Sequence, residues 1–106
     1  MTDETEKPKI NGEAFEPIVI KLRNKIIANG EEVDEITFRE PTAADIERVG
    51  NPVNIDPEYK VTFDSKAMTQ MMSILAAVPP STIRQMKTKD WNTAAWSLAS
   101  FFLPDL

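Results

Sequence analysis

The side chains that enzymes use most often for acid–base and nucleophilic chemistry are missing from this chain. Its 106 residues include no His and no Cys, which removes the commonest general base, the thiolate nucleophile and the usual zinc ligands. Carboxylates do occur in close pairs, Asp34/Glu35 and Asp56/Glu58. Neither pair has a partner base or the number and spacing of oxygen ligands of a calcium loop. We interpret them as solvated charges and expect no catalytic residue, no metal ligand and no cofactor.

The overall charge argues against two further classes of function. The net charge is −5 and the pI about 4.7, whereas nonspecific nucleic-acid binding requires clustered Lys and Arg. The longest uncharged run, residues 91–104, is too short and too polar to span a bilayer. The acidic first residues also lack the basic n-region of a signal peptide. We therefore expect a cytoplasmic protein that binds neither nucleic acid nor membrane.

The chain length allows one domain with a modest core. Residues 1–16 are rich in charge and hold almost no apolar side chain before Phe15, so we predict a disordered acidic arm. For residues 17–106 we predict a single α+β domain, an N-terminal β-hairpin packed against a helical C-terminal half of three to four helices. A hairpin alone is marginally stable in water, so the helices must cover its apolar face.

The hairpin is predicted from alternation and from one strong turn signal. Asn29-Gly30 is typical of a tight β-turn, and residues 33–39 form the returning strand. The first strand places apolar side chains on one face at Ile18, Ile20 and Leu22.

Two registers of this hairpin are open. A three-residue loop that begins at Ala28 places Leu22 opposite Ile36 and keeps the apolar face intact, and we prefer it. A two-residue loop pairs Ile26 with Val33 and then needs a bulge near Ile26 to restore the apolar face.

A corner follows the hairpin. Pro41 ends the strand because it lacks a backbone donor. Thr42 with Asp45 three residues later is a capping-box pattern, so a short helix is predicted from Thr42 to about Val49, ended by Gly50. Nothing in this corner has the residue types of a catalytic site.

Residues 50–60 are predicted to form a loop because they are rich in Pro, Asn and Asp. A brief third strand is indicated by the alternation of Tyr59, Val61 and Phe63.

The next helix is predicted to be capped by Asp64 or Ser65 and to end near Val78. Its core-facing stripe consists of Met68, Met71, Met72 and Leu75. Methionine is flexible enough to line an adaptable partner groove, but ordinary core packing is the simpler interpretation.

The last helix carries two apolar stripes and almost no charge. Pro79-Pro80 separates it from the preceding helix, a short helix starts at Ser81 or Thr82, and Asp90 is predicted to cap the last one. The first stripe, predicted to pack on its own domain, consists of Trp91, Ala94, Ala95, Leu98 and Phe102. The second stripe consists of Trp96, Ala99 and Leu103, with Phe101 at its flank.

The second stripe points away from the first and is not covered by the surface on which the first is predicted to pack. We predict that Trp96, Ala99, Phe101 and Leu103 bind a partner or a second copy of this chain, since exposed Trp is enriched among residues that carry binding energy. Burial of Trp96 within the monomer is the alternative.

The corner and the last helix together resemble a known family. The corner reads Arg39-Glu40-Pro41-Thr42, followed by Asp45-Ile46, and Asp90 precedes Phe101-Phe102. From about Pro17 to Leu103 this pattern is similar to the tail assembly chaperones of long-tailed bacteriophages.

The resemblance implies a function without catalysis. Members of this family bind the long, hydrophobic, helical tape measure protein in the infected or lysogenic bacterial host, keep it soluble until tail-tube subunits assemble around it, and are absent from the finished virion. Many are made in two forms by translational frameshifting, and this chain would correspond to the shorter one. A small structural virion protein or a phage regulator that binds a host protein is the alternative.

Overall fold

Two β-hairpins and four helices build the part of the chain that the structure, a computed structural model, describes, residues 17–103. The first hairpin consists of β1 (Ile18–Ala28) and β2 (Glu31–Phe38), and α1 (Ala43–Val49) follows it. A smaller hairpin of β3 (Val53–Ile55) and β4 (Val61–Phe63) leads into α2 (Ser65–Ala76), α3 (Pro80–Ile83) and α4 (Thr88–Ala99). The predicted α+β architecture is confirmed. The predicted arm, residues 1–16, lies outside the described residues.

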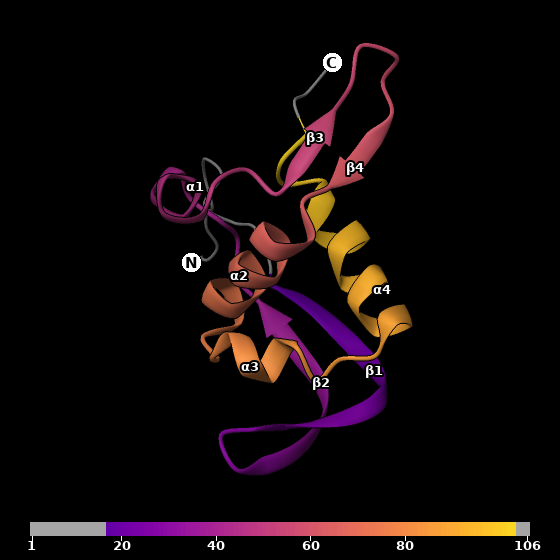
Figure 1. Ribbon diagram of the computed structural model, residues 1–106. Coiled ribbons are helices and arrows are strands. Elements are labelled where there is room, and N and C mark those ends of the chain that lie inside the picture. Colours follow the sequence, from indigo (N-terminus) through magenta and orange to yellow (C-terminus); the bar gives the residue numbers. More distant parts are fainter. Residues whose placement is uncertain (1–16, 104–106) are drawn as a thin grey trace, which may run out of the picture.

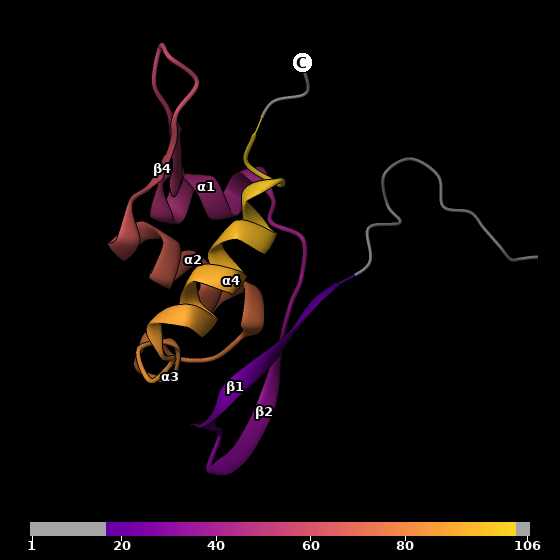
Figure 2. The same cartoon turned by 90° about the vertical axis from the view of Figure 1, so that its right-hand side faces the viewer.

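The two hairpins extend from opposite ends of the helical part (Figure 1). α4 packs against β1 and α2 packs against β2, so the helices cover the inner face of the first hairpin. Figure 2 shows α4 in front of α2, with the β1–β2 hairpin below both helices. No helix in this part of the chain combines the length and hydropathy needed to cross a membrane.

The turn of the first hairpin contains two residues. Asn29 and Gly30 have φ values of 55° and 80°, and two positive φ angles in succession are typical of the type I′ turn that suits strand twist. Next to this turn, Ile26 pairs with Val33. The loop is therefore the shorter of the two considered above.

Further along the hairpin the register shifts between Lys21 and Ile26, so that Ile20 pairs with Ile36. The preferred register, which placed Leu22 opposite Ile36, is wrong, and the two-residue loop with a bulge is correct. The bulge lies before Ile26 and keeps both Ile20 and Leu22 buried. Both apolar side chains thus stay on the core side although the ladder between them and the turn is interrupted.

This bulge is held by a carboxylate from α4. Between the paired ends, β1 contains residues 22–25 while β2 contains Asp34 alone. The backbone N–H of Arg23 donates to both oxygens of Asp90 at 3.0 Å, and the N–H of Asn24 donates to Oδ2 at 3.2 Å. Asp90 is 2% exposed. Its carboxylate therefore accepts from donors that the interrupted ladder leaves without a strand partner.

The edge of β1 near the turn is bonded by a second side chain. The N–H of Ile27 donates to Oε1 of Gln85 at 2.8 Å, and Nε2 of Gln85 donates to the carbonyl of Ile27 at 2.8 Å. The amide of Gln85 thus takes the place of a neighbouring strand. Because Gln85 and Asp90 lie on either side of the start of α4, they fix this part of the chain onto β1.

The role predicted for Asp90 as the cap of the last helix is wrong. α4 begins at Thr88 with Lys87 as its N-cap residue, and Asp90 lies in its first turn with the carboxylate directed to β1. The short helix α3 also begins earlier than expected, at Pro80. Proline lacks a backbone N–H, but at the first position of a helix this N–H would have no intrahelical acceptor, so its absence costs no hydrogen bond.

The helix predicted after the second hairpin is confirmed, with one boundary corrected. Asp64 caps α2 by accepting from the N–H of Ala67 at 3.0 Å. The helix ends at Ala76 instead of near Val78 because Ala77 adopts the left-handed conformation, with φ 57°.

The corner after β2 has the predicted capping box. Thr42 is the N-cap of α1, and its N–H and hydroxyl both donate to the Asp45 carboxylate, at 2.8 and 3.2 Å. Arg39 donates to both oxygens of the same carboxylate at 2.9 and 3.0 Å. These bonds, with that of Arg39 the largest cause, lower the pKa of Asp45 from 3.8 to about 2 although the group is buried. Gly50 ends the helix with φ 96°.

The second hairpin was predicted in part. Val61 and Phe63 form β4 as expected, but the loop predicted for residues 50–60 contains a further strand, β3, that pairs with it. This short strand is defined by its pairing with β4 and by Asp56, whose Oδ1 accepts from the N–H groups of Glu58 and Lys60. A three-residue strand next to Pro and Asn has no periodicity of its own to recognise.

The core lies between the first hairpin and α2 to α4. The methionine stripe of α2 is completely buried there, which confirms the core interpretation and excludes an exposed methionine groove. The largest of the fully buried side chains are those of Phe38, Met68, Met71, Met72, Ile83, Leu98 and Pro52.

Candidate partner-binding surface

Trp96 is the main apolar side chain that α4 leaves open. It is 57% exposed, although a Trp of a small domain usually buries most of its indole. One edge contacts β4, since the rings of Phe63 and Trp96 meet edge to face with centroids 4.8 Å apart and planes at 74°. The predicted alternative, burial of Trp96 within the monomer, is wrong.

The other three residues predicted to bind a partner are less accessible. Ala99 is 2% exposed and belongs to the core. It follows Ala95 by four residues and therefore lies one turn further along the same buried face. Phe101 and Leu103 come after the end of α4 and are half-buried against the core. The four residues thus do not form one continuous open stripe.

The predicted inward stripe of α4 is confirmed at its centre. Ala94, Ala95 and Leu98 are each 0% exposed, whereas Trp91 and Phe102 are half-buried at its two ends. The indole Nε1 of Trp91 donates to the hydroxyl of Thr69 on α2 at 3.0 Å.

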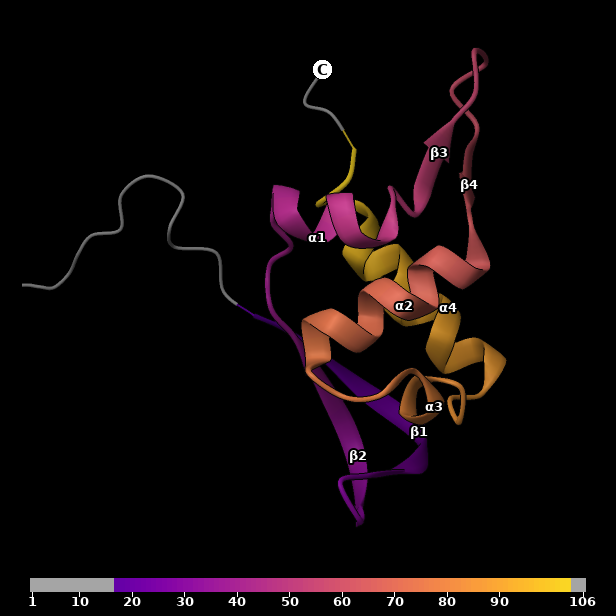
Figure 3. The ribbon, with the colours of Figure 1, turned by 60° about the vertical axis from the view of Figure 1, so that its left-hand side comes forward.

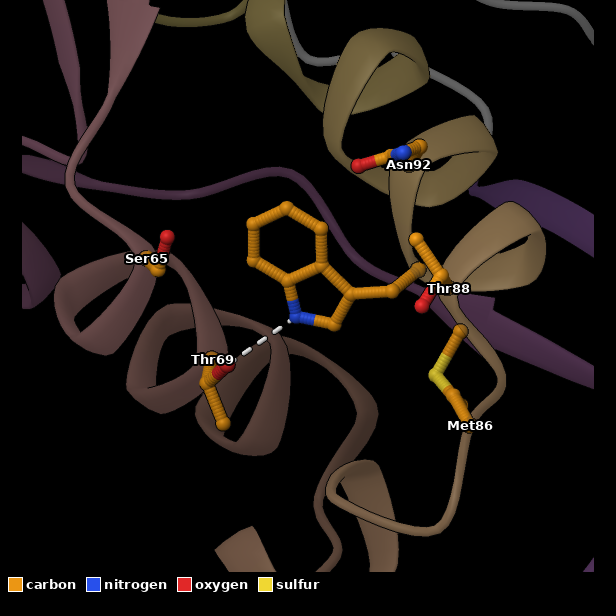
Figure 4. Close-up of a pocket in the computed structure, with 6 residues that line it drawn as sticks. Ser65, Thr69, Met86, Thr88 and Asn92 are labelled. Carbon is orange, nitrogen blue, oxygen red and sulfur yellow. Dashed lines mark hydrogen bonds between the residues drawn. The ribbon is translucent and has the colours of Figure 1, made fainter.

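Trp91 forms part of a shallow hollow between α2 and α4. Ser65 and Thr69 come from α2, Thr88 and Asn92 from α4, and Met86 from the segment between α3 and α4. Figure 4 shows this hollow, with the hydrogen bond to Thr69 dashed. Its lining combines the Trp91 ring and the Met86 side chain with hydroxyl and amide groups, so that apolar and polar groups share the hollow.

Phe63 joins this hollow to Trp96. Its ring also meets that of Trp91 edge to face, with centroids 6.5 Å apart. We call Phe63, Trp91 and Trp96 the aromatic face. The sequence analysis assigned Phe63 to a strand and missed this role, because a contact between β4 and α4 depends on the tertiary arrangement.

Three lysines are sequence neighbours of residues that line the hollow. Lys66 follows the lining residue Ser65, and Lys87 and Lys89 flank Thr88. All three lysines are exposed, and none of them belongs to a salt bridge within residues 17–103. No cluster of three or more acidic side chains suited to a metal ion occurs in the described part of the chain.

Comparison with known proteins assigns the family. The model of a family described as phage tail assembly chaperone proteins, E, or 41 or 14, matches residues 19–103. No curated protein and no solved structure gives a significant match. The matched region covers both hairpins and all four helices of the described residues. The chain therefore belongs to a family of phage tail assembly chaperones.

Proposed function

We infer that this chain binds the tape measure protein and keeps it soluble in the cytoplasm of the infected or lysogenic bacterium until the tail tube assembles. It acts by binding, without catalysis. The single observation that carries this proposal, beside the family, is the aromatic face, where Trp96 is 57% exposed against Phe63.

The chemistry of this face suits a chaperone. A long apolar helix in water exposes side chains that associate with one another, and covering them on a soluble protein prevents this. An exposed Trp with one edge supported by another ring offers a large apolar area at little cost in side-chain entropy. A helix laid against α4 would cover Trp96, as in other helix-in-groove contacts.

Co-production in bacteria tests the proposal. The tape measure protein of the same phage is produced alone and together with this chain, and its soluble fraction is measured. We expect it to be largely insoluble alone, soluble with this chain, and to copurify with it. Equal solubility in both cases, or no copurification, would contradict the proposed function.

Purified phage particles provide the second measurement. A chaperone leaves before the tail is complete, so we expect no signal from this chain by mass spectrometry of particles. Its presence in stoichiometric amounts would assign it to the virion structure instead.

A further inference from the structure

The charge distribution of the described residues is uneven in a way that bears on the partner. Residues 65–103, which include α2 to α4, contain four cations, Lys66, Arg84, Lys87 and Lys89, and one carboxylate, Asp90. The four cations are exposed. Asp90 is buried and its oxygens accept from the β1 bulge. The exposed charge of this helical half is therefore entirely positive, although the whole chain is acidic.

Three of these cations are sequence neighbours of residues that line the hollow at Trp91. Lys66 follows Ser65 on α2, Lys87 is the N-cap residue of α4, and Lys89 follows Thr88 in the first turn of α4. Asp64, the exposed acid that precedes Ser65, is engaged as the cap of α2. Cations that have no salt bridge within residues 17–103, next to residues that line a hollow with hydroxyl and amide groups, favour a carboxylate-bearing occupant.

Lys89 and Trp96 also lie on one face of α4. They are seven residues apart, two helical turns, so their side chains project in nearly the same direction. A segment that places a carboxylate at Lys89 can therefore place an apolar side chain on Trp96. The spacing matches that of two side chains seven residues apart on a partner helix.

We propose that the hollow between α2 and α4, with the aromatic face, docks an acidic segment of the tape measure protein that carries carboxylates beside an apolar side chain. The carboxylates pair with Lys66 and Lys89, and the apolar side chain covers Trp96. This inference rests on the proposed function and names the chemistry of the segment that is bound.

A second copy of this chain fits less well. In a two-fold dimer the same patch meets itself, which would bring the lysines of one copy against those of the other. Like charges across an interface are unfavourable. The charge pattern thus selects a partner of opposite sign over a symmetric dimer.

Charge reversal with a matched control tests the proposal. Overlapping labelled peptides that cover the tape measure protein are titrated with the wild-type chain, with Lys66→Glu/Lys89→Glu, and with Arg48→Glu/Lys60→Glu. The control variant has the same change in net charge at exposed positions on α1 and in the β3–β4 turn. Thermal melting of each variant establishes that it is folded before binding is compared.

We expect the retained peptides to carry net negative charge and to contain apolar residues. Their Kd should rise about tenfold or more in Lys66→Glu/Lys89→Glu and stay within about twofold in the control. Binding should also weaken with added salt.

Other results overturn the proposal in distinguishable ways. If the retained peptides are basic or neutral, or if Lys66→Glu/Lys89→Glu binds them as the wild type does, the charge assignment is wrong while the proposed function stands. If sedimentation shows a dimer that this variant abolishes, the occupant is a second copy. If the wild type binds neither the peptides nor the full-length tape measure protein, the proposed function itself is wrong and this inference falls with it.

Discussion

Asp45 connects the end of one hairpin to the start of a helix through a single carboxylate. Its two oxygens accept from Arg39, which follows β2, and from Thr42, which caps α1. The carboxylate is buried and the guanidinium is about half exposed. A buried carboxylate with several donors is stable as the anion, and this explains why its pKa lies at about 2.

Stability should therefore depend on pH at this residue. The folded pKa of about 2 lies below the ordinary 3.8, so the contribution of the Asp45 anion is present above about pH 4 and is lost as the pH falls through 2. Screening of the half-exposed Arg39 reduces the contribution, and we expect about 1 to 2 kcal/mol at pH 7. Asp45→Asn should lower the free energy of unfolding by that amount.

Urea unfolding of Asp45→Asn and wild type between pH 7 and pH 2 measures this difference. Glu47→Gln is the matched control, because Glu47 is an exposed acid on the same helix. A difference between Asp45→Asn and wild type that does not shrink toward pH 2 would show that the carboxylate charge is unimportant here.

At the scale of elements, the bulge in β1 is the place where the first hairpin is hydrogen-bonded to α4. Leu22 and Ile26 stay buried although residues 22–25 leave the ladder. The freed N–H groups of Arg23 and Asn24 donate to Asp90. Strand, bulge and α4 are therefore one structural unit, which explains why the start of α4 is held so closely to β1.

Asp90→Asn tests this unit. An amide has one acceptor oxygen and places an NH2 donor where the second oxygen was, so one backbone N–H would face another donor. We expect a loss of about 2 kcal/mol in the free energy of unfolding. Hydrogen exchange at the amides of Arg23 and Asn24 should become faster than in the wild type.

Asp34→Asn provides the comparison, since Asp34 is an exposed acid opposite the same bulge. It should change stability by less than about 0.5 kcal/mol. Slow exchange at Arg23 and Asn24 in the Asp90 variant would mean that another group bonds the bulge.

Sequence patterns predicted the elements that depend on local signals. The Asn29-Gly30 turn, the Thr42 cap and the methionine stripe of α2 each need residues within a few positions of one another. The register of β1 could not be predicted in this way, because the bulge is stabilised by Asp90, which lies more than sixty residues along the chain. The three-residue loop was preferred because it kept the apolar side chains of β1 on one face. The bulge has the same effect in the correct register with the two-residue loop.

The candidate site was predictable to the same limited extent. Two stripes on one helix indicated that Trp96 faces away from Trp91. Ala99 was assigned to the open stripe although it is buried, because a small side chain at the border of the buried face fits either side. Phe101 and Leu103 were assigned by helical spacing, which does not apply after α4 ends at Ala99.

At the scale of the whole molecule, the helices separate the two hairpins (Figure 3). The side chains of α4 show that this helix has one covered and one open side. The covered side holds Ala94, Ala95 and Leu98 against β1 and the core. The open side presents Trp96. Folding and binding should therefore depend on different residues of the same helix.

The two tryptophans of α4 allow a direct comparison. Trp91→Ala removes a half-buried indole, its hydrogen bond to Thr69 and its contact with Phe63, so it should lower the free energy of unfolding by about 3 kcal/mol. Trp96→Ala removes mainly one edge-to-face contact from the free protein, which is worth about 1 kcal/mol. Thermal melting of both variants shows whether Trp91→Ala destabilises the fold more than Trp96→Ala does.

The most direct test is the retention of tape measure protein by Trp96→Ala, compared with wild type and Trp91→Ala at a temperature where all three are folded. We predict that Trp96→Ala weakens binding by about 2 kcal/mol, or roughly thirtyfold in Kd, while its melting temperature stays closer to that of the wild type than the melting temperature of Trp91→Ala does. If Trp96→Ala binds as the wild type does, or if it unfolds while Trp91→Ala stays folded, the open and covered sides of α4 have been assigned the wrong roles.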